Sequence, residues 1–298
     1  MDKQKTRRAP QLLGRAASAV VRLWNEEHLH RLLVGTRRFV LCALLMRANV
    51  LGGYAPFGLA MASAMMAQGA GLSALGGVVC GAMLMEDGLL GGVYVAAALI
   101  VLCVMSICTG LDVVRRPWFA PAAAAAAGTA CTFVFLPFGE ELRAPVVMTF
   151  LAVQGMTFGA CRVYGAALAP PREDSDWRRP VTLLAVTATV LLSVSDLSLF
   201  GLFAPARAAS LLLVLGTAYL GGPAAGAAAG VAFGAVMDLG VGEGALFTCC
   251  YGLSATAAGL FREGGRGKFA LCAFASGLCA AMLGTGSDLF IPMLSELT

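Results

Sequence analysis

Long stretches without a charged residue limit the possible folds of this chain more than any other feature of its sequence. Residues 88–110 and 181–195 contain no Asp, Glu, Lys or Arg, and a helix needs ~20 apolar residues to cross the hydrocarbon core of a bilayer. The whole chain is 59% hydrophobic and 13% charged, whereas soluble domains are about 45–50% apolar and about 25% charged. We therefore predict an all-α fold, that of a polytopic helical membrane protein.

Breaks in the apolar pattern and the distribution of charge predict the number and direction of the spans. Cytoplasmic loops carry the excess of Lys and Arg, and with eleven spans the basic loops all fall on the side of the N-terminus. Merging the first two spans into one kinked helix gives ten but places the later basic loops outside. We expect about 10–11 transmembrane helices, with the N-terminus inside. The candidate spans are 34–50, 54–68, 70–86, 88–110, 118–137, 145–169, 181–202, 206–220, 222–240, 245–261 and 269–285.

A basic segment, residues 1–33, precedes the membrane domain, which we assign to residues 34–298. Apolar residues recur at helical spacing from Leu12 to Trp24, with Arg15 on the other side. This pattern is typical of an amphipathic helix that lies on an anionic lipid surface. A solvated tail in front of the first span is the alternative interpretation.

Two similar interrupted segments predict an internal duplication. The segments "RANVLGGYAP" (residues 47–56) and "DLSLFGLFAP" (residues 196–205) both begin with a charged residue and end in Gly-x-aromatic-Ala-Pro. We expect parallel repeats over residues 34–169 and 181–298, six spans plus six with the last span missing. Residues 284–298 ("GTGSDLFIPMLSELT") resemble the start of a further span that stops, as expected of a truncated product.

Glycine and proline interrupt the helical pattern inside both segments. Such interruptions are tolerated in membranes where other parts of the protein satisfy the freed backbone groups. At corresponding places in two repeats they also point to a transport site. The predicted helix-break residues are Gly52, Gly53, Pro56, Gly201 and Pro205.

Arg47, Asp196 and Asp238 are the candidate charges within the membrane. An ionisable residue at membrane depth costs at least ~2.5 kcal/mol, so Arg47 and Asp196 could pair near the repeat axis. The alternative places both in the headgroup layer. Asp238 either marks an ion path or lies at a solvent-facing helix end.

Four glycines spaced by four residues form a row that another helix can approach closely. We predict a packing seam within the chain, with self-association as the alternative. The row consists of Gly222, Gly226, Gly230 and Gly234.

Motifs of soluble catalysis are absent from the sequence. It contains no Walker loop, no G-x-S-x-G and no H-E-x-x-H segment. The ten cysteines lie in apolar runs without C-x-x-C spacing, as expected of buried small hydrophobes. We expect no catalytic residue, no metal site and no cofactor in this chain, and no nucleic-acid partner, since topology accounts for the basic residues.

Three segments together resemble the membrane region of the stage II sporulation protein E family. They are "LLMRANVLGGYAPFGLAMASA" (44–64), "AYLGGPAAGAAAGVAFGAVMDL" (218–239) and "AGLFREGGRGKFALCAFASG" (258–277). The similarity extends from about Leu33 to the end of the chain. Its most specific parts are the Arg47-Ala48 pair and the Pro-Phe-Gly-Leu-Ala run that follows.

The resemblance implies a protein with a membrane region, a central segment that associates with cell-division machinery, and a cytoplasmic PP2C-type serine phosphatase that uses manganese or magnesium. The family's phosphatase acts on an anti-anti-sigma factor and so releases the first forespore sigma factor at the asymmetric septum. This chain resembles the membrane region alone, so the metals and these protein partners belong to regions outside it. The implied location is the bacterial cytoplasmic membrane, and the septal membrane during sporulation. The family is described with ten spans, which differs from the eleven counted here.

Two functions follow as hypotheses. The chain is the membrane anchor and localisation region of such a phosphatase, or it is a small polytopic transporter or uptake component with a midplane site at the interrupted helices. A transporter needs a water-accessible cavity lined by Arg47 and Asp196, whereas an anchor is expected to be packed shut there.

Overall fold

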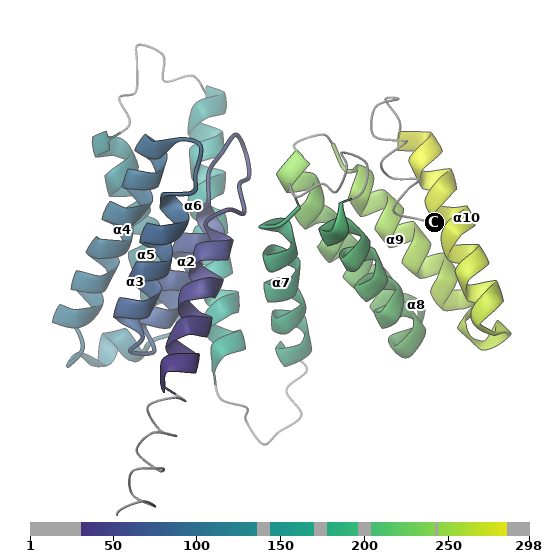
Figure 1. Cartoon of the computed structure of the whole chain (residues 1–298), viewed down its shortest axis with the longest axis horizontal. Coiled ribbons are helices and arrows are strands. Elements are labelled where there is room, and N and C mark those ends of the chain that lie inside the picture. The colour runs from purple at the N-terminus through teal and green to yellow at the C-terminus, as the bar shows by residue number, and fades with distance from the viewer. Residues whose placement is uncertain (1–30, 136–143, 170–177, 196–203, 242–243, 285–298) are drawn as a thin grey trace, which may run out of the picture.

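The computed structural model describes residues 31–135, 144–169, 178–195, 204–241 and 244–284. Within these residues all regular elements are helices, and the only β-type contact is an isolated bridge between Val50 and Tyr54. A first helix covers residues 31–45 and carries no label in Figure 1. It is followed by α2 (Pro56–Met66), α3 (Gly71–Ala82), α4 (Gly88–Ile107), η1 (Asp112–Arg115), α5 (Phe119–Phe135), α6 (Ala144–Leu168), α7 (Arg178–Leu192), α8 (Pro205–Val241), α9 (Leu246–Leu260), η2 (Arg262–Gly264) and α10 (Arg266–Gly284).

The helices form two bundles that lie side by side (Figure 1). The first helix and α2 to α6 surround one apolar core, which includes Met61 and Tyr94. Helices α7 to α10 surround a second core, which includes Phe233 and Tyr251. Because α7 packs against both α6 and α8, it joins the two bundles.

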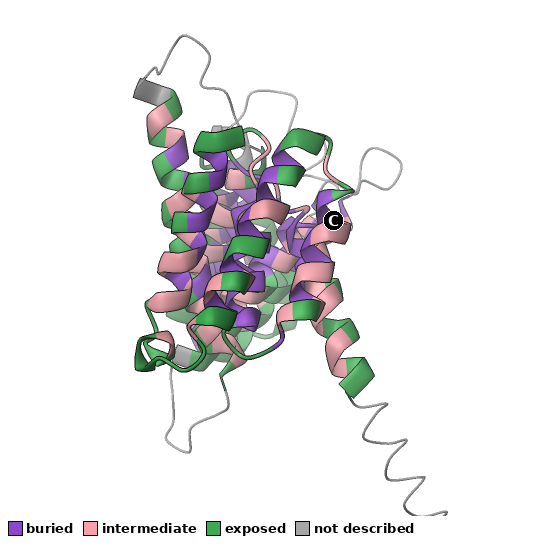
Figure 2. Cartoon of the chain, turned by 90° about the vertical axis from the view of Figure 1, so that its left-hand side faces the viewer, coloured by how far each residue is buried: buried purple, intermediate pink, exposed green. Residues whose placement is uncertain are grey.

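Apolar side chains cover the outside of the bundles as well as filling their cores. Leu72, Ile107 and Leu220 each expose 83% of their surface, and Figure 2 shows the buried residues gathered between the helices with exposed ones around them. Three helices are long and apolar enough to cross a membrane: α4, residues 146–168 of α6 and residues 205–240 of α8. The prediction of a helical protein with candidate membrane spans is confirmed.

The first predicted spans differ most from the helices that form. The span predicted over residues 34–50 ends at residue 45, and residues 46–55 separate it from α2, so one kinked helix is wrong. Helices α2 and α3 have 11 and 12 residues, which at 1.5 Å per residue makes them about 17 and 18 Å long. Each is therefore shorter than the ~30 Å hydrocarbon core of a bilayer.

Helix α8 consists of two antiparallel limbs that meet at Gly222. This residue has φ 82° and ψ −173°, which is not helical, and Pro223 follows it. A methyl group added at Gly226 would lie 2.9 Å from the Cα of Ala218. In a straight helix these two positions would be about 12 Å apart along the axis, so the limbs fold back on each other. They match the separate spans predicted over 206–220 and 222–240.

Replacing Gly222 by alanine should destabilise the protein by about 1–3 kcal/mol, because almost only glycine adopts this backbone conformation. Gly216 is the matched control, since it lies in the preceding limb and has no neighbouring atom within 4 Å of an added methyl group. Alanine at Gly216 should be neutral or stabilising by up to about 1 kcal/mol. Thermal unfolding in detergent, followed by circular dichroism, measures both; equal losses would contradict the strained turn.

Candidate functional site

Residues 46–55, here called the break hairpin, connect the first helix to α2. Val50 and Tyr54 exchange both of their backbone hydrogen bonds, with N···O distances of 2.8 and 3.0 Å. The three residues between them have positive φ, at 51° for Leu51, 87° for Gly52 and 105° for Gly53. The two glycines therefore allow a tight turn that is closed by the paired backbone groups of Val50 and Tyr54.

The end of the break hairpin is fixed to α4. The backbone N–H of Ala55 donates a hydrogen bond of 2.9 Å to the hydroxyl of the buried Tyr94. Pro56 then begins α2, where the missing N–H of proline leaves no hydrogen bond unmade. The interruption in the sequence is thus a compact turn that points α2 back into the bundle.

Arg47 lies in the turn directly after the first helix, with a half-buried side chain. Its backbone N–H donates to the carbonyl oxygen of Leu44 at 2.9 Å. Among the described residues, no carboxylate forms an ion pair with it. Asp196 and Gly201 lie outside the described residues, so the pairing of Arg47 with Asp196 stays a prediction.

The start of α8 is held in a similar way to the start of α2. Pro205 is the first residue of α8, and the hydroxyl of Tyr251 in α9 donates to the carbonyl oxygen of Arg207 at 3.1 Å. The guanidinium of Arg207 lies 5.1 Å from the centre of the Phe247 ring. An α9 tyrosine therefore contacts the first turn of α8, as Tyr94 of α4 contacts the residue before α2.

The glycine row lies between the second limb of α8 and α9. A methyl group added at Gly230 would lie 2.6 Å from the carbonyl oxygen of Tyr251, and one at Gly234 would lie 2.6 Å from that of Phe247. A methyl group added at Gly226 would lie 3.1 Å from the carbonyl oxygen of Ala255. Only glycine permits this close approach of two backbones. Gly222, the first of the row, forms the turn instead.

Asp238 caps α9 from the end of α8. Its carboxylate accepts hydrogen bonds from the backbone N–H of Phe247 at 2.8 Å and of Thr248 at 2.9 Å, and from the Thr248 hydroxyl at 2.6 Å. The residue is 8% exposed, so the interpretation as a solvent-facing helix end is wrong. An acidic group at a helix N-terminus is stabilised by the unpaired N–H groups there.

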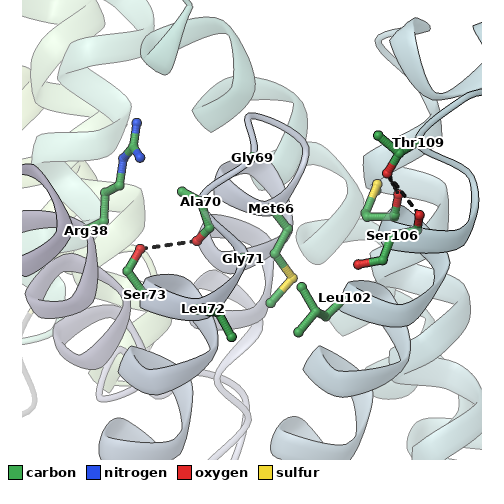
Figure 3. Close-up of a pocket in the computed structure, with 11 residues that line it drawn as sticks. Arg38, Met66, Gly69, Ala70, Gly71, Leu72, Ser73, Leu102, Ser106 and Thr109 are labelled. Carbon is green, nitrogen blue, oxygen red and sulfur yellow. Dashed lines mark hydrogen bonds between the residues drawn. The ribbon is translucent and has the colours of Figure 1, made fainter. Parts of the chain in front are cut away.

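Two cavities adjoin these elements. The first, about 550 Å³ and here called the Arg38 cavity, lies between the first helix, the turn from α2 to α3, and the end of α4 (Figure 3). The second, about 290 Å³ and here called the interbundle cavity, lies between α2, α6, α7 and α8. The described residues that line it are apolar apart from Tyr164 and Thr189, and the Tyr164 hydroxyl donates to Thr189 Oγ1 at 2.9 Å. Arg47 lines neither of these two cavities.

The described residues contain no group of three His, Cys, Asp or Glu side chains that could hold a metal ion. The side chains brought together here pack helices, cap them or line cavities. The cavity residues Arg38, Ser106 and Thr109 were not singled out from the sequence, because they are far apart in the chain and lack a shared motif. An arginine directly before an apolar run, as Arg38 is before Phe39, is the one signal that could have found them.

Comparison with protein-family models finds no matching family, and neither the curated proteins nor the solved structures contain a match to this chain.

Removal of the Asp238 carboxylate should cost roughly 1–3 kcal/mol, because Asp238→Ala leaves the buried N–H of Phe247 without its acceptor and α9 without its cap. Glu86→Ala is the control: Glu86 is an exposed acid before α4, and no hydrogen bond or ion pair of it occurs among the described residues. Guanidinium unfolding in detergent should separate the two variants. If Glu86→Ala lowered the free energy of unfolding as much as Asp238→Ala, the change in net charge would explain the loss and the cap would not.

Pairing of Arg47 with Asp196 predicts a coupled double-mutant cycle. Arg47→Ala and Asp196→Ala should each destabilise the protein, and the double variant should lose at least about 0.5 kcal/mol less than the sum. Equilibrium unfolding of the four proteins gives the coupling energy. Additive losses would exclude the pair.

Proposed function

We propose that this chain is a membrane domain that anchors and positions a PP2C-type serine phosphatase of the stage II sporulation protein E kind. The sequence resemblance from Leu33 onward motivates the proposal. It is supported by the all-helical fold, the three long apolar helices and the apolar outer surface. The proposed location is the bacterial cytoplasmic membrane, and the septal membrane during sporulation.

The distribution of charge supports an orientation with the N-terminus inside. Arg115, Arg262 and Arg266 lie in or beside η1 and η2, on the same face as the start of the first helix (Figure 1). We call this the basic face. Glu86 and Asp87 lie in the turn between α3 and α4, on the opposite face. Basic loops are retained on the cytoplasmic side of a membrane.

The order of the elements supports the proposed duplication. The first helix, the pair α2–α3, α4, η1 and α5 recur as α7, the two limbs of α8, α9, η2 and α10. Gly69 between α2 and α3 has φ 81°, and Gly222 between the limbs of α8 has φ 82°. Pro56 and Pro205 begin corresponding helices. Together with α6, the described residues then contain eleven α-helical segments, with the two limbs of α8 counted separately.

The burial of α2 is the observation that carries the anchoring function. All 11 of its residues are buried, because α3, α4, α5 and α6 surround it. In a transporter, this interrupted helix would line a water-filled path near the membrane midplane. Here side chains such as Leu59 and Met61, each 1% exposed, fill that space. A closed bundle therefore fits a membrane anchor better than it fits a transporter.

The interbundle cavity favours a second candidate, an uptake component for an apolar solute. It lies between the two proposed repeats, where the halves of a transporter form their site, and its walls include Phe57, Tyr164 and Val236. Uptake of an apolar compound that is lost in Ala188→Trp, which fills the cavity, would support this candidate over the anchor.

Purification of the chain from its own cells by an N-terminal tag tests the anchoring function. We expect phosphoserine phosphatase activity to co-purify, to disappear with EDTA and to return with Mn²⁺, because the resemblance implies a metal-dependent enzyme. An unrelated polytopic protein with the same tag is the control. Absence of such activity, together with a coding sequence that continues into no phosphatase and has none beside it, would contradict the proposal.

A further inference from the structure

The Arg38 cavity opens at the basic face and combines a positive charge with an apolar floor. Arg38 contributes the guanidinium from the first helix, and Met66, Leu72 and Leu102 contribute apolar surface from α2, α3 and α4. None of the described residues that line the cavity is acidic. Its volume of about 550 Å³ is within the range of ~300–1,000 Å³ that is typical of small-molecule sites.

Donors for an anion gather at one side of this cavity. The Arg38 guanidinium has no ion pair within the described part of the chain, and it projects above Ser73 in Figure 3. Beside it, α3 begins at Gly71 without a side-chain cap from Ala70, so the first N–H groups of α3 adjoin the same space. A guanidinium and free N–H groups that line the same cavity can both donate to the oxygens of a phosphate.

Acceptors lie on the walls of the same cavity. The Ser73 hydroxyl donates to the carbonyl oxygen of Ala70 at 3.2 Å, and the Thr109 hydroxyl donates to that of Met105 at 2.6 Å. Both oxygens therefore remain as acceptors. The Ser106 hydroxyl lies on the Thr109 side, across the cavity from Arg38 (Figure 3). A ligand that carries hydroxyl groups beyond its phosphate fits these walls better than one that ends in a quaternary ammonium.

From these observations we propose that the Arg38 cavity binds the headgroup of an anionic phospholipid with a hydroxyl-bearing headgroup, taken from the inner leaflet. The guanidinium and the first turn of α3 hold the phosphate, Ser73, Ser106 and Thr109 contact the headgroup hydroxyls, and Met66, Leu72 and Leu102 contact the upper acyl chains. The basic face raises the local concentration of anionic lipid. This inference rests on the proposed membrane location, but not on a phosphatase.

The test is a titration of the full chain in a neutral detergent with dioctanoyl phosphatidylglycerol, followed by the thermal unfolding midpoint. Phosphatidylglycerol should raise the midpoint, and dioctanoyl phosphatidylcholine and inorganic phosphate should do so much less. Arg38→Gln should require about tenfold more phosphatidylglycerol for the same shift, since one charge-assisted contact to phosphate is lost. Arg37→Gln is the matched control, because Arg37 is the exposed neighbour outside the cavity and its loss changes the net charge equally.

Three other outcomes of this titration would each overturn the inference. Equal weakening by Arg37→Gln and Arg38→Gln would mean attraction by net charge alone. An equal response to phosphatidylcholine would exclude recognition of the anionic headgroup, and an equal response to inorganic phosphate would assign the cavity to a soluble anion.

A second variant covers the case in which Arg38→Gln does not fold. Ser106→Phe places a bulky side chain at an exposed position of the cavity wall and leaves every charge in place, so it should abolish the response to phosphatidylglycerol. A retained response would contradict the site. Failure to recover phosphatase activity would contradict the proposed function and leave this lipid response standing.

Discussion

Satisfaction of backbone hydrogen bonds within apolar surroundings is the constraint on which the rest of the structure depends. In lipid, an unpaired N–H or C=O has no water to bind, so each place where the helix stops needs partners within the protein. The break hairpin supplies them through the bridge from Val50 to Tyr54 and the bond from Ala55 to Tyr94. In the second bundle, Asp238 supplies them for the first turn of α9. These few contacts decide where helices turn and therefore which helices can pack together.

Close packing follows from those turns. Once Gly222 reverses α8, the second limb runs antiparallel to α9, and the glycines at 226, 230 and 234 come to face its backbone. In the other bundle, the break hairpin turns α2 between α3, α4, α5 and α6, where all of its residues are buried. The result is a domain with large apolar surfaces outside and few polar groups inside. Such a domain suits a role that requires a fixed position in the membrane.

Much of this fold could be predicted from the sequence, because apolar runs and their breaks mark helices directly. The predicted spans at 88–110 and 245–261 correspond to α4 and α9. The candidate site was harder to predict. The partner of Asp238 comes from the following helix, and the role of Tyr94 depends on a residue 39 positions earlier. The Arg38 cavity needs residues from four separate helices. Patterns along the chain report local conformation, whereas these contacts depend on tertiary packing that single-sequence periodicity does not encode.

The turn at Gly222 also has a consequence for the length of the chain within the bilayer. Residues 205–240 form 36 residues of helix, which as one straight rod would extend about 54 Å, far beyond the ~30 Å of hydrocarbon available. No charged residue lies between Arg207 and Asp238 to mark a boundary. A single glycine thus turns an over-long apolar rod into two limbs of suitable length. If residue 222 became helical, the two ends of α8 would lie on opposite faces of the protein. Helices α9 and α10 would then have the inverse orientation relative to the membrane.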